Sequence, residues 1–285
     1  MKTWTTLVDV EALARQLGDP QLRLVDARFV LADPEAGRTA YAQSHLPGAV
    51  YVDLNRDLSD LSRTGQGRHP LPSDTAFTRR LGELGIAPQT QVVVYDASDG
   101  SMAAARFWWM LKLLGHEAVA VLDGGLQAWR EHALPETDAA VKVAPQAAYP
   151  ARFDTGRIAD AAEVLARLSA DSGWLIDARA PERFRGEVEP IDPVAGHVPG
   201  AVNRPYASHL RAGRFLPAEE LRESFAPLLK LHRAGDLVLM CGSGVTACHL
   251  LLALEHAGVR GARVFAGSWS GWISDPARPV ERGAG

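Results

Sequence analysis

The residue of this chain best suited to chemistry is a cysteine between an apolar run and a glycine-rich turn. Cys241 follows "LVLM" and opens the segment "CGSGVTA", and a helical pattern begins near Thr246. Glycines let the chain bend sharply, so the amides of the loop and of the helix N-terminus can converge on one point. These donors and the helix dipole stabilise an anion. We therefore expect Cys241 to act as a nucleophilic thiolate at neutral pH.

Two other roles are compatible with a cysteine at this position. A buried structural role is common for cysteine, but packing alone does not require a glycine turn at a strand end. Cys248 lies among apolar residues of the following helix, and we expect that side chain to be packed. Cysteine phosphatases share the strand, loop and helix, but they need an arginine six residues after the cysteine to clamp phosphate. Ala247 stands there, which argues against phosphatase activity.

The elements that must position this loop occur twice in the chain. The segment "LVDAR" recurs as "LIDAR", "SHLPGAV" recurs as "GHVPGAV", and "GGLQAW" has a weaker echo in "GSWSGW". The echoes keep their order at nearly constant spacing, which indicates duplication of one unit. We predict one domain over residues 1–138, an Ala- and Pro-rich linker over 139–150 and a second domain over 151–285.

Each half alternates helical patterns with short apolar runs, which is typical of buried parallel strands. The predicted fold class is α/β, with two tandem domains that each contain a mainly parallel sheet flanked by helices. Ligands of such sheets lie beyond the carboxyl ends of the strands. Asp96 and Cys241 end equivalent apolar runs, "QVVVYD" and "DLVLMC".

The composition excludes several classes of function. The chain has 285 residues, 22% of them charged, with a net charge of −4, which gives no reason to expect nucleic acid or a membrane surface as partner. The N-terminus has no signal-peptide pattern, and two cysteines cannot form a disulfide framework, so a cytoplasmic protein is expected. No Cys-x-x-Cys or His-x-x-x-His pair and no P-loop lysine occur, so we expect no metal and no cofactor.

The sequence resembles the tandem-domain sulfurtransferases of the rhodanese family, and it is most similar to the 3-mercaptopyruvate sulfurtransferase branch. The motifs that carry the resemblance span both halves in order: "HLPGAV", "YDASDGSMAAARFWWML", "LDGG", "DARAPERFRG", "GHVPGAVN" and "CGSGVTACH". Thiosulfate-preferring tandem members usually carry basic residues directly after the cysteine. Gly242 and Ser243 stand there in this chain.

The resemblance implies that the second domain is catalytic and that the first has lost its cysteine. Asp96 stands at the equivalent place and cannot form a persulfide. The Cys241 thiolate would take a sulfur atom from 3-mercaptopyruvate as a persulfide and pass it to a thiol or to cyanide. The implied partners are a small-molecule sulfur donor and a thiol acceptor, such as thioredoxin or a low-molecular-weight thiol.

The family protonates the leaving pyruvate enolate with a Ser–His–Asp set. Ser243 matches it within the loop, His69 matches it in "RHPLP", and Asp53 matches it in "YVDLN". Because His69 and Asp53 precede residue 138, the resemblance implies a site in a cleft between the two domains.

The family binds the carboxylate of the donor with arginine. Arg183 in "RFRG" matches one such residue, but the second usually lies nine residues further on, where this chain has Asp192. Arg185 or Arg204 is expected to substitute for it. The loop residues expected to contact the donor are Gly242, Gly244, Val245 and Thr246.

Two alternatives stay open at this point. Thiosulfate could be the donor, which the missing second arginine favours. A non-catalytic binding module is the other alternative, and the intact Cys241 with its glycines argues against it.

Overall fold

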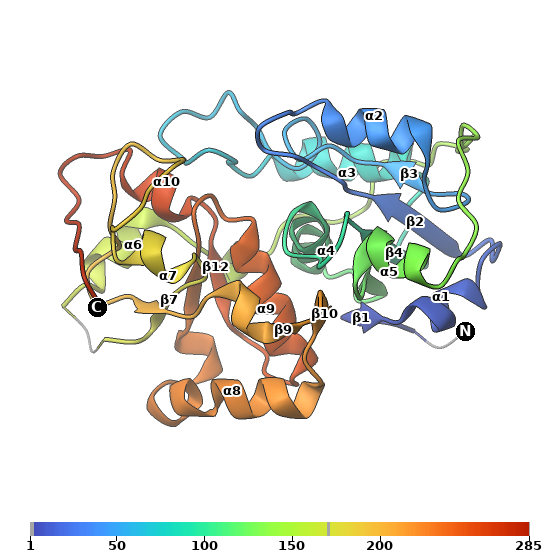
Figure 1. Cartoon of the computed structure of the whole chain (residues 1–285). Coiled ribbons are helices and arrows are strands. Elements are labelled where there is room, and N and C mark those ends of the chain that lie inside the picture. Colours follow the sequence, from blue (N-terminus) through green and yellow to red (C-terminus); the bar gives the residue numbers. More distant parts are fainter. Residues whose placement is uncertain (1–2, 170–171, 285) are drawn as a thin grey trace. The chain divides into compact units, whose positions relative to one another are not determined.

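The structure, a computed structural model, describes residues 3–169 and 172–284. The chain divides into two compact units (Figure 1): unit 1 contains Met1–Asp60 and Leu71–Asp154, and unit 2 contains Leu61–Pro70 and Thr155–Gly285. This division differs from the predicted domains at three places. Residues 139–150, predicted as a linker, lie within unit 1, residues 61–70 belong with unit 2, and residues 151–154, which were predicted in the second domain, lie within unit 1.

Backbone hydrogen bonds explain the first difference. The amide of Gln146 donates to the carbonyl oxygen of Gly82 at 2.8 Å, and the amide of Tyr149 donates to the carbonyl oxygen of Thr78 at 3.0 Å. The segment is therefore held against a helix of unit 1, although its composition suggested a free linker.

Unit 1 contains a five-stranded sheet with the order β1-β5-β4-β2-β3, in which every pairing is parallel. Its strands are β1 (Leu7–Val8), β2 (Leu22–Asp26), β3 (Val50–Tyr51), β4 (Gln91–Tyr95) and β5 (Val119–Leu122). Its helices are α1 (Val10–Ala14), α2 (Ala36–Gln43), α3 (Asp74–Glu83), α4 (Ala103–Leu113) and α5 (Gly125–Glu131).

Unit 2 repeats this topology with the parallel order β6-β12-β11-β7-β8. Its strands are β6 (Ile158–Ala159), β7 (Leu175–Asp177), β8 (Val202–Asn203), β11 (Val238–Met240) and β12 (Arg263–Phe265), and an antiparallel pair is added by β9 (Leu210–Arg211) and β10 (Arg214–Phe215). Its helices are α6 (Ala161–Ala166), α7 (Pro181–Phe184), α8 (Ala218–Leu231), α9 (Thr246–His256) and α10 (Ser268–Trp272), with the 3₁₀ turns η1 (Thr155–Arg157), η2 (Tyr206–His209) and η3 (Ala234–Asp236).

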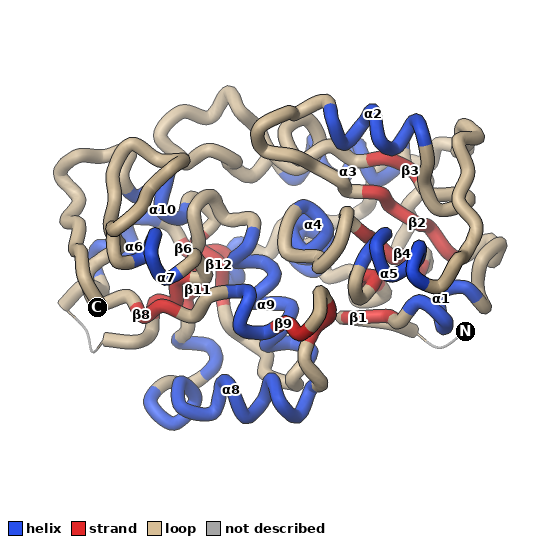
Figure 2. Tube along the Cα trace, in the orientation of Figure 1, coloured by secondary structure: helices blue, strands red, loops and turns tan. Residues whose placement is uncertain are grey.

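The predicted α/β fold with two tandem, mainly parallel sheets flanked by helices is thus confirmed (Figure 2). The central strands β4 and β11 are buried at every position. Such strands are covered on both faces, which is why their sequences are continuous apolar runs and do not alternate.

The duplication extends to individual hydrogen bonds. Nη2 of Arg28 donates to Oδ2 of Asp26, and Nη2 of Arg179 donates to Oδ2 of Asp177, both at 2.7 Å. Each arginine also donates to a backbone carbonyl oxygen in the loop that follows, at Ser44 and at Gly196. The repeated "DAR" motif therefore forms the same buried ion pair in each half, which braces the end of the strand.

Each unit has its own hydrophobic core. In unit 1 the cluster includes Leu24, Val93 and Trp129, and in unit 2 it includes Leu175, Met240 and Trp272. The two tryptophans end the third sequence echo, and their indole N–H groups donate to the carbonyl oxygens of Pro135 and Pro279, both at 2.9 Å.

Candidate active site

Cys241 directly follows strand β11 and lies at the carboxyl end of the unit 2 sheet, as the sequence predicted. The N-terminus of α10 fixes its backbone from both sides. The amide of Cys241 donates to Oγ of Ser268 at 3.0 Å, and its carbonyl oxygen accepts from the amide of Trp269 at 2.9 Å. The next carbonyl oxygen, of Gly242, accepts from the amide of Ser270 at 2.8 Å. The residue is 1% exposed, so its sulfur is held in a rigid and largely dry setting.

The turn after the cysteine depends on one glycine. Gly244 has a φ of +75°, and a Cβ at this position would lie 2.1 Å from the carbonyl oxygen of Ala266. Any other residue would therefore force the loop away from the end of β12. The glycine allows the chain to enter α9 at Thr246, the residue predicted from the sequence.

The first turn of α9 begins at Thr246, five residues after Cys241. Val245 is the N-cap residue, and it makes no side-chain hydrogen bond to the helix amides. Amide groups of a first helical turn that lack a side-chain cap can accept an anion, with support from the helix dipole. Cys248 lies within this helix, is buried, and donates its S–H to the carbonyl oxygen of Gly244 at 3.2 Å, which agrees with the packed role predicted for it.

His69 contacts the cysteine loop within unit 2. Its Nδ1 lies 2.8 Å from Oγ of Ser243, within hydrogen-bond distance, and both residues are buried. The segment 61–70 is hydrogen-bonded to α10 and to the residues that follow that helix. The amide of Arg68 donates to Oγ of Ser270 at 2.9 Å, and Oγ of Ser274 donates to the carbonyl oxygen of Gly65 at 2.9 Å. These bonds explain the second difference from the predicted domains, and they bring together His69 and Ser243.

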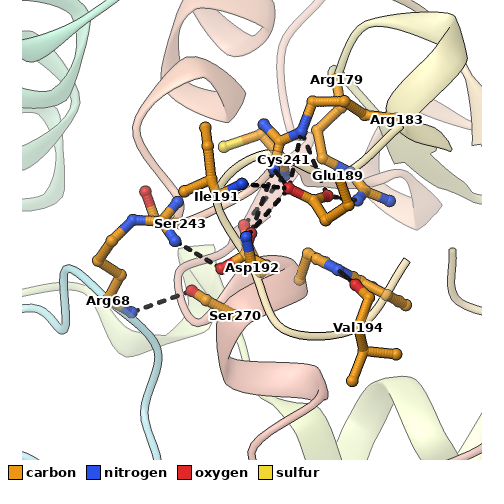
Figure 3. A network of polar contacts seen from close by, with 12 residues as sticks. Arg68, Arg179, Arg183, Glu189, Ile191, Asp192, Val194, Cys241, Ser243 and Ser270 are labelled. Atoms are coloured by element: carbon orange, nitrogen blue, oxygen red, sulfur yellow. Dashed lines mark hydrogen bonds and ion pairs between the residues drawn. The ribbon is translucent and has the colours of Figure 1, made fainter. Parts of the chain in front are cut away.

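Arg183 lies beside the loop at the centre of a polar network (Figure 3). Its Nη2 donates to Oε1 of Glu189 at 2.7 Å and to Oδ2 of Asp192 at 3.2 Å. Burial alone would raise the pKa of Glu189, but the hydrogen bonds from Arg183 and from backbone amides lower it overall. Asp192, the acid found where a second arginine was expected, also pairs with Arg68, whose Nη1 lies 2.5 Å from its Oδ1.

The other two predicted arginines differ in their contacts, and the buried Nε of Arg204 has no hydrogen-bond partner among the described residues. Arg185 forms an exposed pair with Glu187, at 2.7 Å and 2.9 Å. Arg204 donates its backbone amide to the carbonyl oxygen of Asp177 at 2.9 Å. The structure therefore does not bring Arg185 into the network around Arg183, and Arg68 is the guanidinium that shares Asp192 with it.

Asp53 belongs to unit 1. Its Oδ1 accepts from the amides of Asn55 and Arg56 at 2.9 Å and 3.0 Å, and its Oδ2 lies 3.5 Å from the hydroxyl of Tyr51. The carboxylate thus forms a local turn at the end of β3.

The unit 1 counterpart of the cysteine loop holds an acid. Asp96 follows β4, and its carbonyl oxygen accepts from the amide of Leu126 at 3.0 Å, just as Cys241 accepts from Trp269. The Asp96 carboxylate accepts from the amides of Ser98, Gly100 and Met102. Burial is the main cause that raises the pKa of Asp96 to about 6, with a further contribution from Asp99, while these amide donors oppose the shift.

Sequence reasoning missed three contributors to this site: Arg68, which pairs with Asp192; Ser268, which holds the cysteine amide; and Ser270, which ties the 61–70 segment to the loop. An available signal was the acid at 192, because a largely buried carboxylate needs a cationic partner. Within residues 3–169 and 172–284, no group of three His, Cys, Asp or Glu side chains is arranged to hold a metal ion. The helices in this described part are all too short or too polar to cross a membrane.

Comparison with known proteins shows the family of the chain. The family described as a Rhodanese-like domain matches residues 9–132 and 160–275. A probable 3-mercaptopyruvate sulfurtransferase of Pseudomonas aeruginosa is 46% identical, over 97% of this chain and 98% of its own length. A putative thiosulfate sulfurtransferase, SseB of Mycobacterium tuberculosis, is 44% identical, over 94% of this chain and 93% of its own.

A solved structure gives the same result. The crystal structure of SseA from Escherichia coli, a 3-mercaptopyruvate sulfurtransferase, superposes with a TM-score of 0.80 at 32% identity, over 94% of this chain and 100% of that one. The matches cover both halves, so the resemblance stated from the sequence is confirmed. The chain belongs to the rhodanese family, as a member with two rhodanese-like domains in tandem and with relatives that are named sulfurtransferases.

Proposed function

We propose that this protein is a 3-mercaptopyruvate sulfurtransferase that carries the sulfur as a persulfide on Cys241. One observation carries the proposal most directly. A buried cysteine directly follows the central strand β11, its loop is hydrogen-bonded to α10, and the Ser243–His69 pair lies in the same unit. The relatives named above support the class of reaction.

In the first step the Cys241 thiolate attacks the sulfur atom of the donor. A sulfur–sulfur bond forms and the carbon–sulfur bond of 3-mercaptopyruvate breaks. The electron pair of that bond moves to carbon, so the leaving fragment is the enolate of pyruvate. The loop amides and the first turn of α9 stabilise negative charge on the sulfur during this step.

The enolate carbon then takes a proton and becomes pyruvate. We propose that Ser243 and His69 deliver it, because a hydroxyl and an imidazole in hydrogen-bond contact can pass a proton between them. Asp53 stays a proposed third member of this set on the strength of the resemblance alone.

In the second step an acceptor thiolate attacks the outer sulfur of the persulfide. A new sulfur–sulfur bond forms on the acceptor, the bond to Cys241 breaks, and the cysteine leaves as a thiolate ready for another cycle. Cyanide would take the same sulfur as thiocyanate. We propose a thiol such as thioredoxin or a low-molecular-weight thiol as acceptor, which steady-state rates with each acceptor would test.

We propose that the first rhodanese-like domain does not take part in sulfur transfer. A carboxylate cannot carry sulfane sulfur, and the Asp96 carboxylate already occupies the amides of its own loop. Both cysteines of the chain are free. Thiolate chemistry suits the reducing cytoplasm, which we propose as the location and which cell fractionation would test.

Thiosulfate is the second candidate donor, because one close relative carries that name. The residues after the nucleophile, Gly242 and Ser243, are uncharged, whereas the nearby cations are arginines suited to a carboxylate. Rates with the two donors and one thiol acceptor separate the candidates. We expect kcat/KM for 3-mercaptopyruvate to exceed that for thiosulfate by at least about tenfold, which corresponds to one good charge-assisted hydrogen bond. A preference for thiosulfate would overturn the proposal.

A further inference from the structure

Two arginines face the glycine that follows the nucleophile. A Cβ placed on Gly242 would lie 3.3 Å from Nη2 of Arg68 and 3.6 Å from Nη1 and Nη2 of Arg183. Both guanidinium groups therefore lie close to the backbone of Gly242, the residue next to Cys241. They come from distant parts of the sequence, Arg183 from α7 and Arg68 from the 61–70 segment (Figure 3).

Asp192 fixes the spacing of these two cations. Its Oδ1 pairs with Nη1 of Arg68 at 2.5 Å, and its Oδ2 pairs with Nη2 of Arg183 at 3.2 Å. The Asp192 side chain is only 3% exposed, and its amide donates to Oε1 of Glu189 at 3.1 Å. Asp192 therefore bridges the two guanidinium groups through its two carboxylate oxygens, and these ion pairs orient Arg68 and Arg183.

Arg68 keeps donor capacity that its ion pair does not use. With Nη1 on Asp192, its Nη2 faces Gly242, and its buried Nε has no hydrogen-bond partner among the described residues. An unmet buried donor is costly, and a ligand that accepts from it recovers that cost. Arg179 donates from Nε and Nη2 to Asp177 and to the carbonyl oxygen of Gly196, and its Nη1, which has no hydrogen-bond partner among the described residues, lies 3.5 Å from Oε2 of Glu189.

We propose that Arg68 is the second cation that binds the donor, and that with Arg183 it reads the carboxylate of an α-keto acid. This inference rests on the proposed function. It gives Arg68 the carboxylate-binding role that the family resemblance assigns to an arginine at position 192. Arg68 here is a binding and specificity residue, while Asp192 is a positioning residue. Paired guanidinium groups match the two oxygens of a carboxylate in geometry as well as charge.

The charges of the network explain why it would select a monoanion. Three arginines, Arg68, Arg179 and Arg183, are balanced by three acids, Asp177, Glu189 and Asp192. Recognition therefore depends on the direction of the N–H groups more than on excess positive charge. A dianion such as thiosulfate gains no additional attraction from a neutral network, whereas a carboxylate gains paired hydrogen bonds.

The test compares two donors that differ only in the group being read. Mercaptoacetone has the ketone and thiol of 3-mercaptopyruvate, with a methyl group in place of the carboxylate. For Arg68→Gln we expect KM for 3-mercaptopyruvate to rise about 10- to 100-fold, as for loss of one partner of a charged hydrogen bond. For mercaptoacetone, kcat/KM should change less than about twofold, because the lost contact is absent from that reaction.

Two further variants keep the test decisive. Arg68→Lys retains a positive charge for Asp192, which protects the fold, but it loses the planar pair of donors, so a smaller rise in KM is expected. Arg185→Gln is the matched control, since this exposed arginine pairs with Glu187, and both donors should behave as with the native protein.

Equal losses for both donors in Arg68→Gln, or no loss for 3-mercaptopyruvate, would overturn the inference. Failure of the proposed function is a separate observation, because the native protein itself would then prefer thiosulfate or transfer no sulfur. Pyruvate binding to the Cys241→Ser protein, followed by calorimetry, supplies a readout that is independent of turnover. Its affinity should fall by a similar factor when Arg68→Gln is added, and an unchanged affinity would count against the inference.

Discussion

The loop at Cys241 and the loop at Asp96 occupy the same place in two copies of one sheet, but their strand-end residues carry different ionisable groups. Both follow a buried central strand, and both accept a hydrogen bond from the helix after the next strand, from Trp269 in one case and from Leu126 in the other. In the Asp96 loop, the carboxylate of the strand-end residue itself accepts from three loop amides. In the Cys241 loop, the strand-end residue is a thiol.

The comparison separates what the fold supplies from what one residue supplies. The topology brings loop amides to the side chain at the carboxyl end of the central strand, where three of them donate to the Asp96 carboxylate. The residue at the strand end then determines whether this place holds a carboxylate, which cannot carry sulfur, or a thiol, which can. We therefore propose that one copy of the duplicated unit has a catalytic loop, whereas in the other copy the Asp96 carboxylate occupies the loop amides.

The largest expected effect comes from removing the thiol. Cys241→Ser keeps the size and hydrogen bonding of the side chain but loses the sulfur that must carry the persulfide. We expect kcat/KM for sulfur transfer to fall by at least about 10⁴-fold, as for removal of a nucleophile that forms a covalent intermediate. Sulfur transfer that persisted at the native rate would contradict the assignment. Cys248→Ser is the matched control and should retain transfer.

The second effect concerns the His69–Ser243 pair at the Cys241 loop. His69→Asn or Ser243→Ala should lower kcat with 3-mercaptopyruvate by about 10²- to 10³-fold, within the range of general acid–base catalysis. Because the two residues act through one hydrogen bond, the double variant should lose little more than either single variant. Fully multiplied losses would show that they act independently.

A smaller effect is expected on the other side of the comparison. The pKa of Asp96 is raised by burial from 3.8 to about 6 in the folded protein, so the native state favours its protonated form. Its contribution to stability is complete below about pH 4 and is lost as the pH rises through 6. Asp96→Asn remains neutral, so relative to the native protein it should gain about 1–3 kcal/mol in the free energy of unfolding between pH 4 and 7.

Urea unfolding of the full-length native and Asp96→Asn proteins at several pH values measures this gain. A difference that does not change with pH would contradict the role given to burial. Sulfur transfer should be unaffected by the same variant.

The smallest effect concerns the residue that holds the cysteine backbone. Ser268 has a φ of +50° and accepts from the Cys241 amide, while Gly125 holds the corresponding place in unit 1 with a φ of +55°. Ser268→Ala should cost about 1–2 kcal/mol, because a buried amide loses its partner. Ser268→Gly loses the same bond but relieves the left-handed backbone, so it should cost less. Thermal unfolding would rank the two variants, and the reverse order would contradict this explanation.

The features predicted well from the sequence are those set by local pattern. Apolar runs between helical segments specified parallel strands, and the glycines after Cys241 specified the turn into α9. The repeated "DAR" motifs form equivalent Asp–Arg pairs in the two units, and the tryptophans that end the third repeat make equivalent indole hydrogen bonds.

The features that the sequence did not reveal depend on long-range contacts. Residues 61–70 precede the predicted boundary, and their long-range contacts with Ser243, Asp192, Ser270 and Ser274 place them in unit 2. Arg68 and Asp192 are 124 residues apart, so no spacing rule pairs them. Arg185 was expected to substitute for the missing arginine because it lies near Arg183 in sequence, but its guanidinium pairs with Glu187 at the surface.

Mass spectrometry of the intact protein and its peptides after incubation with 3-mercaptopyruvate, without an acceptor, tests the central claim most directly. The account predicts one added sulfur atom on the peptide containing Cys241, none on Asp96 or its loop, and loss of the added sulfur when a thiol acceptor is supplied. A protein that stays unmodified while pyruvate is released, or a sulfur atom found on Cys248 in place of Cys241, would contradict it.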